Sequence, residues 1–198
     1  MSEHEFDEAR NLDGRMTVAL GQNESLDVVF SAEAIAIRLE ELAAEVSAAR
    51  LEPLLVIAIL KGSFVFAADL IRALNRAGLQ PEVDFLTLSS YRKSRVSRGS
   101  VDILRDVEMD VEGRNVLLVD DVLDSGRTLA FAKDLVAARG ARQIRTCVLL
   151  DKMTKRAVDV TADFRAFDCP DAFVVGYGMD VAHRFRELPF VGRIVTRP

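Results

Sequence analysis

The chain has 198 residues and a formal net charge of −5, from 26 basic and 31 acidic residues. Its 49% hydrophobic and 29% charged residues match an average globular protein, which excludes a disordered, collagen-like or coiled-coil chain. The acidic balance disfavours a general nucleic-acid binder, because such proteins neutralise phosphates with basic residues, although a local basic patch is compatible with it.

The apolar runs, such as 54–60, are far shorter than the roughly 20 residues of a membrane span, and the acidic N-terminus does not resemble a signal peptide. We therefore expect a cytoplasmic protein with no membrane partner. The two cysteines, Cys147 and Cys169, show neither a disulfide framework nor a metal-binding spacing, so we expect structural thiols. With only His4 and His183, and no G-x-S-x-G elbow, the sequence does not favour a zinc site or a serine hydrolase.

Helices and strands alternate in the first part of the chain. In chain order we expect a loose tail or short edge element at 1–15, a helix at 31–50, a strand at 54–60, a turn at 61–63, a helix at 64–77, and paired strands at 81–91 and 101–107. Ser31 is a good N-cap residue for the first helix, and Gly78 ends the second. The apolar, β-branched run at 54–60 is typical of a parallel strand covered on both faces.

The central part of the chain predicts a strand, a helix and a second strand. Their bounds are 115–120, 128–139 and 144–150, with a loop at 121–127 between the first two. Units of this kind have parallel strands and a right-handed crossover, so we expect an α/β fold with a central parallel sheet. Further strands are expected at 173–177 and 193–196.

The first of these central strands runs directly into three carboxylates and a short turn of small residues. Ser125, Gly126 and Thr128 suit a phosphate, because glycine lets the backbone approach closely, hydroxyls donate hydrogen bonds, and amides at a helix N-terminus attract an anion. Asp120 and Asp121 are compatible with a phosphate nearby if they face a ribose diol and its magnesium ion. The carboxyl end of a strand is also where open α/β sheets bind ligands.

The alternative interpretation of this loop is a helix N-terminus preceded by acids, a common arrangement worth about 0.3 to 1 kcal/mol per charge. It accounts for an acid-rich helix start, but not for the whole string after an apolar strand. The loop is not a P-loop, since lysine and glycine do not stand at the required spacing, and the sequence has no G-x-G-x-x-G dinucleotide motif.

The loop resembles the signature for 5-phosphoribosyl-1-pyrophosphate (PRPP) in the type I phosphoribosyltransferases: an apolar strand, two acids, two apolar residues and an Asp-(Ser/Thr)-Gly-x-Thr loop. Other segments are similar to the hypoxanthine-guanine branch of that family and follow in the same order: 60–62, 90–91, 150–152, and 173–177 with Asp180 and Arg186. The loop alone indicates the superfamily. The lysine segment and the last segments, which resemble the family's purine hood, indicate the branch.

The resemblance implies a type I phosphoribosyltransferase fold. Residues 1–198 would form one domain, with a small hood from the N-terminal segment and 152–198. It also implies a purine salvage enzyme that uses Mg²⁺ to transfer the phosphoribosyl group of PRPP to a 6-oxopurine, hypoxanthine or guanine, giving IMP or GMP and pyrophosphate. A homodimer or homotetramer is implied, with no nucleic-acid or membrane partner.

The resemblance further assigns roles to individual residues. For PRPP and its phosphate these are Asp120, Asp121, Asp124, Ser125, Gly126, Arg127 and Thr128. For pyrophosphate they are Lys61, Gly62, Ser90, Tyr91 and Arg186, with a strained or cis peptide at Lys61. For the purine they are Lys152, Phe173, Val174 and Asp180, and for magnesium Asp120, Asp121 and Asp180. Asp124 is the implied general base, a role that contributes about 10²- to 10⁴-fold.

Several of these residues have an ordinary structural alternative. Asp124 could cap the following helix, Lys152 could be a solvated surface lysine, and Phe173 could be a core residue. As a donor to the purine O6, Lys152 would favour oxopurines over adenine, whose amino group offers no acceptor. Arg184 is the neighbouring alternative to Arg186.

The basic segment at 92–100 differs from the Ser-, Thr- and Gly-rich mobile loop of the family. We expect a lid that excludes water. An oligomer contact, an attraction for the anionic PRPP, and a merely solvated loop are the alternatives.

Two rival functions fit part of the sequence. An RNA-binding attenuation regulator of pyrimidine operons carries a similar loop on the same fold, but Asp124 and the acidic net charge argue against it. Adenine or orotate transfer fits the PRPP loop, but leaves Lys152 and Phe173 without a role.

Overall fold

The computed structural model describes residues 8–10, 16–19, 24–90, 101–152, 154 and 156–196. The chain divides into two compact units, Met1–Ala36 with Ala172–Pro198, and Ile37–Asp171. The single domain with a hood stays a prediction, and the smaller unit is formed by the two ends of the chain. Within the described ranges, no helix has the length and apolar character needed to cross a membrane.

The larger unit is built on a six-stranded sheet in the order β6-β5-β4-β7-β8-β9. Its strands are β4 (Leu54–Leu60), β5 (Glu82–Ser90), β6 (Val101–Arg105), β7 (Asn115–Leu123), β8 (Gln143–Asp151) and β9 (Phe164–Asp168). Neighbouring strands are parallel, except that β6 pairs antiparallel with β5. Residues that follow β4, β5, β7 and β8 therefore share one edge of the sheet, the edge where α/β proteins bind ligands.

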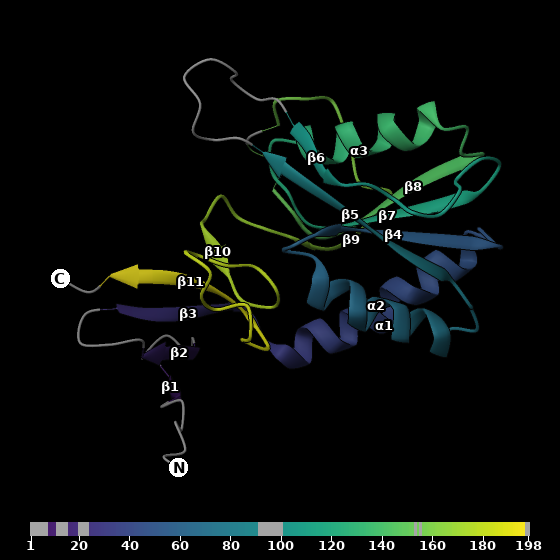
Figure 1. The fold of residues 1–198 in the computed structure, drawn as a ribbon. Helices are drawn as coiled ribbons and strands as arrows, with labels where there is room; N and C mark the ends of the chain where they lie inside the picture. Colours follow the sequence, from purple (N-terminus) through teal and green to yellow (C-terminus); the bar gives the residue numbers. More distant parts are fainter. Residues whose placement is uncertain are drawn as a thin grey trace, which may run out of the picture. The chain divides into compact units, whose positions relative to one another are not determined.

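Helices cover both faces of this sheet. Helix α2 (Phe64–Arg76) and the part of α1 (Ala32–Ala48) that belongs to this unit lie on one face, and α3 (Arg127–Ala138) lies on the other (Figure 1). On the second face, Leu129 and Val136 of α3 share a core with Leu55 and Ile57 of β4. Because successive side chains of a strand point to opposite faces, a strand covered on both sides is apolar throughout, as β4 is.

The helices and strands predicted for this unit are confirmed, with two differences. β7 continues to Leu123, beyond its predicted end at 120, because its last residues still pair with β8, where Leu123 lies opposite Asp151. The loop predicted at 121–127 is therefore wrong at both ends, and the connection from β7 to α3 is limited to 124–126. The other difference is β9, an edge strand that the sequence analysis did not predict.

The smaller unit is an antiparallel sheet in the order β1-β2-β3-β11-β10. Its strands are β1 (Glu8–Arg10), β2 (Met16–Ala19), β3 (Glu24–Phe30), β10 (Val174–Val175) and β11 (Val191–Thr196). Its core contains Leu26 of β3, Val175 of β10, and Phe185, Leu188 and Phe190 from the segment between β10 and β11. β1 matches the expected short edge element, whereas β2 and β3 were not predicted.

The strand predicted at 173–177 is shortened to the two residues of β10. Gly176 and Tyr177 have φ angles of 94° and 48°, in the left-handed region, so the backbone leaves the sheet there. A Cβ on Gly176 would lie 2.2 Å from the carbonyl oxygen of Phe190, so glycine is required. After β10 the chain does not continue as a strand but turns, and Gly176 and Met179 form an antiparallel bridge across this turn.

Candidate active site

The acidic end of β7 lies at the carboxyl edge of the larger unit's sheet. Asp120 is only 5% exposed, and its Oδ1 accepts a hydrogen bond of 3.0 Å from the N–H of Asp121. Burial, followed by the charge of Asp121, raises the pKa of Asp120 well above its ordinary value. Asp121 is partly exposed, and its Oδ1 accepts a 2.9 Å hydrogen bond from the N–H of Val122. The inner carboxyl group therefore resists ionisation, and the outer one is the more accessible.

The turn after β4 lies against this acidic pair. The Leu60–Lys61 peptide bond is cis, as the resemblance led us to expect. A Cβ on Gly62 would lie 1.8 Å from Oδ2 of Asp121, so the carboxylate occupies the space that any other residue would need. Since β4 and β7 are neighbours in the sheet, the predicted pyrophosphate turn and the predicted ribose site meet at this contact.

The connection at 124–126 leads into α3. Gly126 is the N-cap residue, with a φ of 83°, and its carbonyl oxygen accepts a 2.9 Å hydrogen bond from the N–H of Ala130. Because α3 begins at Arg127, Asp124 stands two positions before the N-cap residue, so the alternative that Asp124 caps the helix is wrong. The first amides of a helix have no partner within the helix and can bind an anion.

Lys152 follows β8 and is 7% exposed, so the alternative of a solvated surface lysine is wrong. Its N–H donates a 3.0 Å hydrogen bond to the carbonyl oxygen of Leu123, the last residue of β7. The carbonyl oxygen of Asp151 accepts a 2.8 Å hydrogen bond from the N–H of Cys169. Leu123 and Asp151 are paired in the sheet. The backbones of the residues that follow them, Asp124 and Lys152, therefore leave the sheet next to each other.

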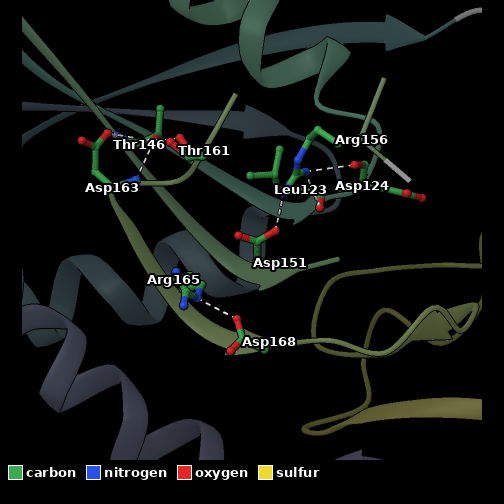
Figure 2. A network of polar contacts seen from close by, with 9 residues as sticks. All are labelled: Leu123, Asp124, Thr146, Asp151, Arg156, Thr161, Asp163, Arg165 and Asp168. Atoms are coloured by element: carbon green, nitrogen blue, oxygen red, sulfur yellow. Dashed lines mark hydrogen bonds and ion pairs between the residues drawn. The ribbon is translucent and has the colours of Figure 1, made fainter. Parts of the chain in front are cut away.

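Arg156 was missed by the sequence analysis and lies beside this edge (Figure 2). Its guanidinium group binds the carboxylate of Asp151 and the carbonyl oxygens of Leu123 and Asp124. The one signal that could have found it is Asp151, which follows the apolar run 147–150: an acid that is buried at the end of such a run needs a cation.

In the smaller unit, Asp180 and Arg186 are bound to each other. Nη2 of Arg186 lies 2.7 Å from Oδ1 of Asp180, and Nη1 donates a 2.6 Å hydrogen bond to the carbonyl oxygen of Gly178. Oδ2 of Asp180 accepts a 2.8 Å hydrogen bond from the N–H of His183. Both carboxylate oxygens of Asp180 therefore already have a partner within this turn.

The remaining predicted residues of the smaller unit differ in exposure. Phe173 is 58% exposed, so the alternative of a core phenylalanine is wrong, whereas Val174 is buried in β10. Arg184, the alternative to Arg186, lies with its guanidinium carbon 5.0 Å from the ring centre of Phe185.

The structure thus brings one group of predicted residues to a single sheet edge. From the larger unit these are Lys61, Gly62, Asp120, Asp121, Asp124, Ser125, Gly126, Arg127, Thr128 and Lys152, and β5 ends at the same edge with Ser90. Phe173, Val174, Asp180 and Arg186 belong to the smaller unit. Tyr91 and the segment 92–100 lie outside the described residues.

Comparison with known proteins identifies the family. A model of the phosphoribosyl transferase domain matches residues 25–182. The hypoxanthine-guanine phosphoribosyltransferase of Bacillus subtilis is 43% identical over 166 residues, which is 83% of this chain and 91% of that protein. The chain belongs to the hypoxanthine-guanine phosphoribosyltransferase family.

Solved structures of this family have the same fold. A crystal structure of a hypoxanthine-guanine phosphoribosyltransferase from Bacillus anthracis is 40% identical, with a TM-score of 0.78 over 87% of this chain and 100% of that one. The hypoxanthine phosphoribosyltransferase of Trypanosoma cruzi in complex with the product IMP is 35% identical, with a TM-score of 0.79 over 86% of this chain and 94% of that one. The predicted α/β type I phosphoribosyltransferase fold is confirmed.

Proposed function

We propose that this protein is a purine salvage enzyme that transfers the 5-phosphoribosyl group of PRPP to a 6-oxopurine, giving IMP or GMP and pyrophosphate. The observation that carries the proposal is the sheet edge at which β7 and β8 end. There an acidic pair, a turn suited to a phosphate and a buried lysine occur together at the ends of two paired strands. Family membership supports the same reaction.

The 5′-phosphate of PRPP is assigned to the turn that opens α3. Gly126 has the left-handed conformation of a close phosphate turn, and Ser125 and Thr128 carry hydroxyl donors. The amides of the first turn of α3 add further donors, and the positive end of the helix dipole adds attraction. Arg127 is exposed at the start of α3, where its charge favours an anionic substrate.

The ribose hydroxyls are assigned to the acidic pair. Carboxylates accept hydrogen bonds from a diol, and Asp121 is the more accessible of the two. Asp120 holds the N–H of Asp121 through a hydrogen bond, so it fixes the orientation of the outer residue.

Magnesium fits the chemistry of the acidic residues, because Mg²⁺ prefers oxygen ligands and takes one or two carboxylates together with substrate phosphates. Of the acidic pair, Asp121 is the more exposed and would hold the ion, and Asp120 is its buried neighbour. Asp180 would act through a water molecule, since both its oxygens are engaged. No group of three or more histidine, cysteine or acidic side chains in the described ranges is placed to hold a metal. Bound magnesium would supply positive charge to the pyrophosphate leaving group.

The purine is assigned to Lys152, with Asp124 as the general base. The buried ammonium group of Lys152 would donate to O6 of hypoxanthine or guanine, but would meet an amino group in adenine. Asp124 starts beside Lys152 and does not cap α3. Its carboxylate can therefore accept a proton from the purine as a purine nitrogen attacks C1 of the ribose. In the smaller unit, the exposed ring of Phe173 is suited to stack on a purine, with Val174 next to it.

Pyrophosphate is assigned to Lys61, Gly62, Ser90, Tyr91 and Arg186. The Leu60–Lys61 peptide bond is cis, and Gly62 follows in the turn at the end of β4, where it presents no side chain. The planar fork of Arg186 suits a phosphate anion, and binding there would compete with Asp180 for the guanidinium group. The lid at 92–100, a homodimer or homotetramer, and a cytoplasmic location stay predictions; size-exclusion chromatography with light scattering measures the assembly.

The proposal is tested by a spectrophotometric assay of the protein with PRPP, Mg²⁺ and one base at a time: hypoxanthine, guanine, xanthine, adenine or uracil. We expect turnover of hypoxanthine, guanine or both, and no turnover of adenine or uracil. A folded protein that converts none of the 6-oxopurines would contradict the proposal, and turnover of adenine alone would favour the rival adenine transferase.

A further inference from the structure

Arg156 binds three groups from two strand ends (Figure 2). Nη1 donates hydrogen bonds of 3.0 Å to the carbonyl oxygen of Leu123 and 2.9 Å to that of Asp124. Nη2 lies 2.5 Å from Oδ1 of Asp151. The side chains of Arg156 and Asp151 are 19% and 5% exposed, so this ion pair is little screened by water. A guanidinium group has the flat, forked geometry needed to serve all three acceptors at once.

The backbone next to Arg156 continues the same contact. The N–H groups of Ala157 and Val158 both donate to the carbonyl oxygen of Ser125, at 2.9 and 3.3 Å. The carbonyl oxygens of Leu123, Asp124 and Ser125 are therefore all held by the segment 156–158. In addition, a Cβ on Gly126 would lie 3.2 Å from Cδ of Arg156 and 3.3 Å from the carbonyl oxygen of Val158, so this segment packs closely against the turn.

These contacts fix the direction of the peptide groups in the turn. In a trans peptide the N–H points opposite to the C=O. With the carbonyl oxygens of Asp124 and Ser125 directed to the segment 156–158, the N–H groups of Ser125 and Gly126 are directed away from it. Successive N–H groups that point the same way form the anion-binding arrangement proposed above for the 5′-phosphate.

The same guanidinium group also reaches the purine side of the site. Asp151 directly precedes Lys152, and Leu123 directly precedes Asp124. Arg156 therefore links the strand end that carries the proposed purine donor to the strand end that carries the proposed base. The polar partners of its guanidinium group are the Asp151 carboxylate and two carbonyl oxygens, rather than the side chains of Asp124 or Lys152.

We propose that Arg156 is a positioning residue for phosphoribosyl transfer, which orients the peptide groups of the 124–126 turn and fixes Asp124 relative to Lys152. The inference rests on the proposed function. It predicts an effect of Arg156 on PRPP binding and on kcat that exceeds its effect on stability.

The test compares three variants of the full chain. Arg156→Lys keeps a charge for Asp151 but lacks the fork that reaches both carbonyl oxygens. Arg156→Met removes the charge, and Asp151→Asn keeps an oxygen acceptor while it removes the ion pair. Arg165→Met is the matched control, because Arg165 pairs with Asp168 at 2.7 Å on the exposed edge strand β9, away from the turn (Figure 2). For each protein we measure kcat, the KM for PRPP and for hypoxanthine, the calorimetric Kd for PRPP with Mg²⁺, and Tm.

For Arg156→Lys we expect kcat to fall at least about tenfold and the Kd for PRPP to rise at least about fivefold, since small displacements of positioned groups are costly. Asp151→Asn should be affected less, because the carbonyl contacts remain, and Arg165→Met should stay within twofold. If Arg156→Met does not fold, Arg156→Lys decides. A kcat and a Kd within twofold of wild type in folded Arg156→Lys would overturn the proposal, as would a loss of Tm alone. If the wild type binds PRPP but converts no purine, the proposed function fails, and the PRPP affinity of Arg156→Lys still decides this inference.

Discussion

The carboxylate of Asp121 fills the space beside Gly62, so closely that a Cβ on Gly62 would lie 1.8 Å from Oδ2. Gly62 lies in the turn that follows β4, and Asp121 lies in the neighbouring parallel strand β7. The resemblance assigns Gly62 to pyrophosphate and Asp121 to ribose. The Asp121 carboxylate can therefore occupy this position only because residue 62 has no side chain.

Gly62→Ala should therefore displace the Asp121 carboxylate. We expect the KM for PRPP to rise and kcat to fall, each severalfold, and the overpacking to cost about 1 to 3 kcal/mol of stability. Steady-state kinetics and thermal unfolding measure both effects. The control is Gly113→Ala, which has open space for a Cβ but a φ of 67°, so it should lower Tm and leave KM unchanged. A Gly62→Ala enzyme with wild-type KM and kcat would show that Asp121 can move without consequence.

Asp120→Asn should change the pH dependence of stability. Burial and the charge of Asp121 raise the pKa of Asp120 in the folded protein above its unfolded value of about 3.9. A group with a raised pKa contributes its full stability below the unfolded pKa, and loses it as the pH rises through the folded pKa. The Tm of Asp120→Asn minus that of the wild type should therefore increase as the pH is raised from about 4. A difference that is constant with pH would contradict the raised pKa.

Lys152→Met keeps most of the buried volume of the side chain and removes its charge. We expect the KM for hypoxanthine to rise at least about tenfold, because the donor to O6 is lost, while the KM for PRPP stays near the wild-type value. The discrimination against adenine should weaken as well. Equal kinetics for both purines in the variant and the wild type would assign Lys152 to structure alone.

The two cysteines should be unreactive in the native protein. Both are buried, and this burial raises the pKa of each thiol. Little thiolate therefore forms at neutral pH. We expect a thiol reagent at pH 8 to modify neither Cys147 nor Cys169 within minutes, and to modify both after unfolding in guanidinium chloride. Rapid modification of Cys169 in the native protein would show that its cover opens, and protection by hypoxanthine would place that opening at the active site.

The sequence was informative where one short segment determined both structure and chemistry. The apolar run at 54–60 predicted β4, and the string of acids, small residues and threonine at 120–128 predicted a ligand site at a strand end. Both features are local: they depend on residues within one strand and the turn that follows it. The family resemblance then connected segments that are far apart in the chain.

The features that were missed depend on long-range pairing. β7 extends to Leu123 because β8 continues beside it, and no property of Asp120 or Asp121 alone indicates a strand. β10 is short because the backbone leaves the sheet at Gly176 and Tyr177, and the requirement for glycine at 176 comes from the distant carbonyl oxygen of Phe190. Arg156 lies in a polar stretch without periodicity, and its role appears only when the ends of β7 and β8 are placed side by side.

Asp124 provides the most direct test of the account, because it is the proposed base and neither caps α3 nor belongs to the acidic pair. The measurement is the rate at which hypoxanthine and PRPP give IMP and pyrophosphate, for the wild type and for Asp124→Asn, with the PRPP affinity of both determined by calorimetry. We predict equimolar IMP and pyrophosphate from the wild type, and a kcat at least about tenfold lower for the variant, with nearly unchanged PRPP affinity. If the folded wild type gave no IMP, the proposed reaction would be wrong. If the two proteins had an equal kcat, Asp124 would not be the general base.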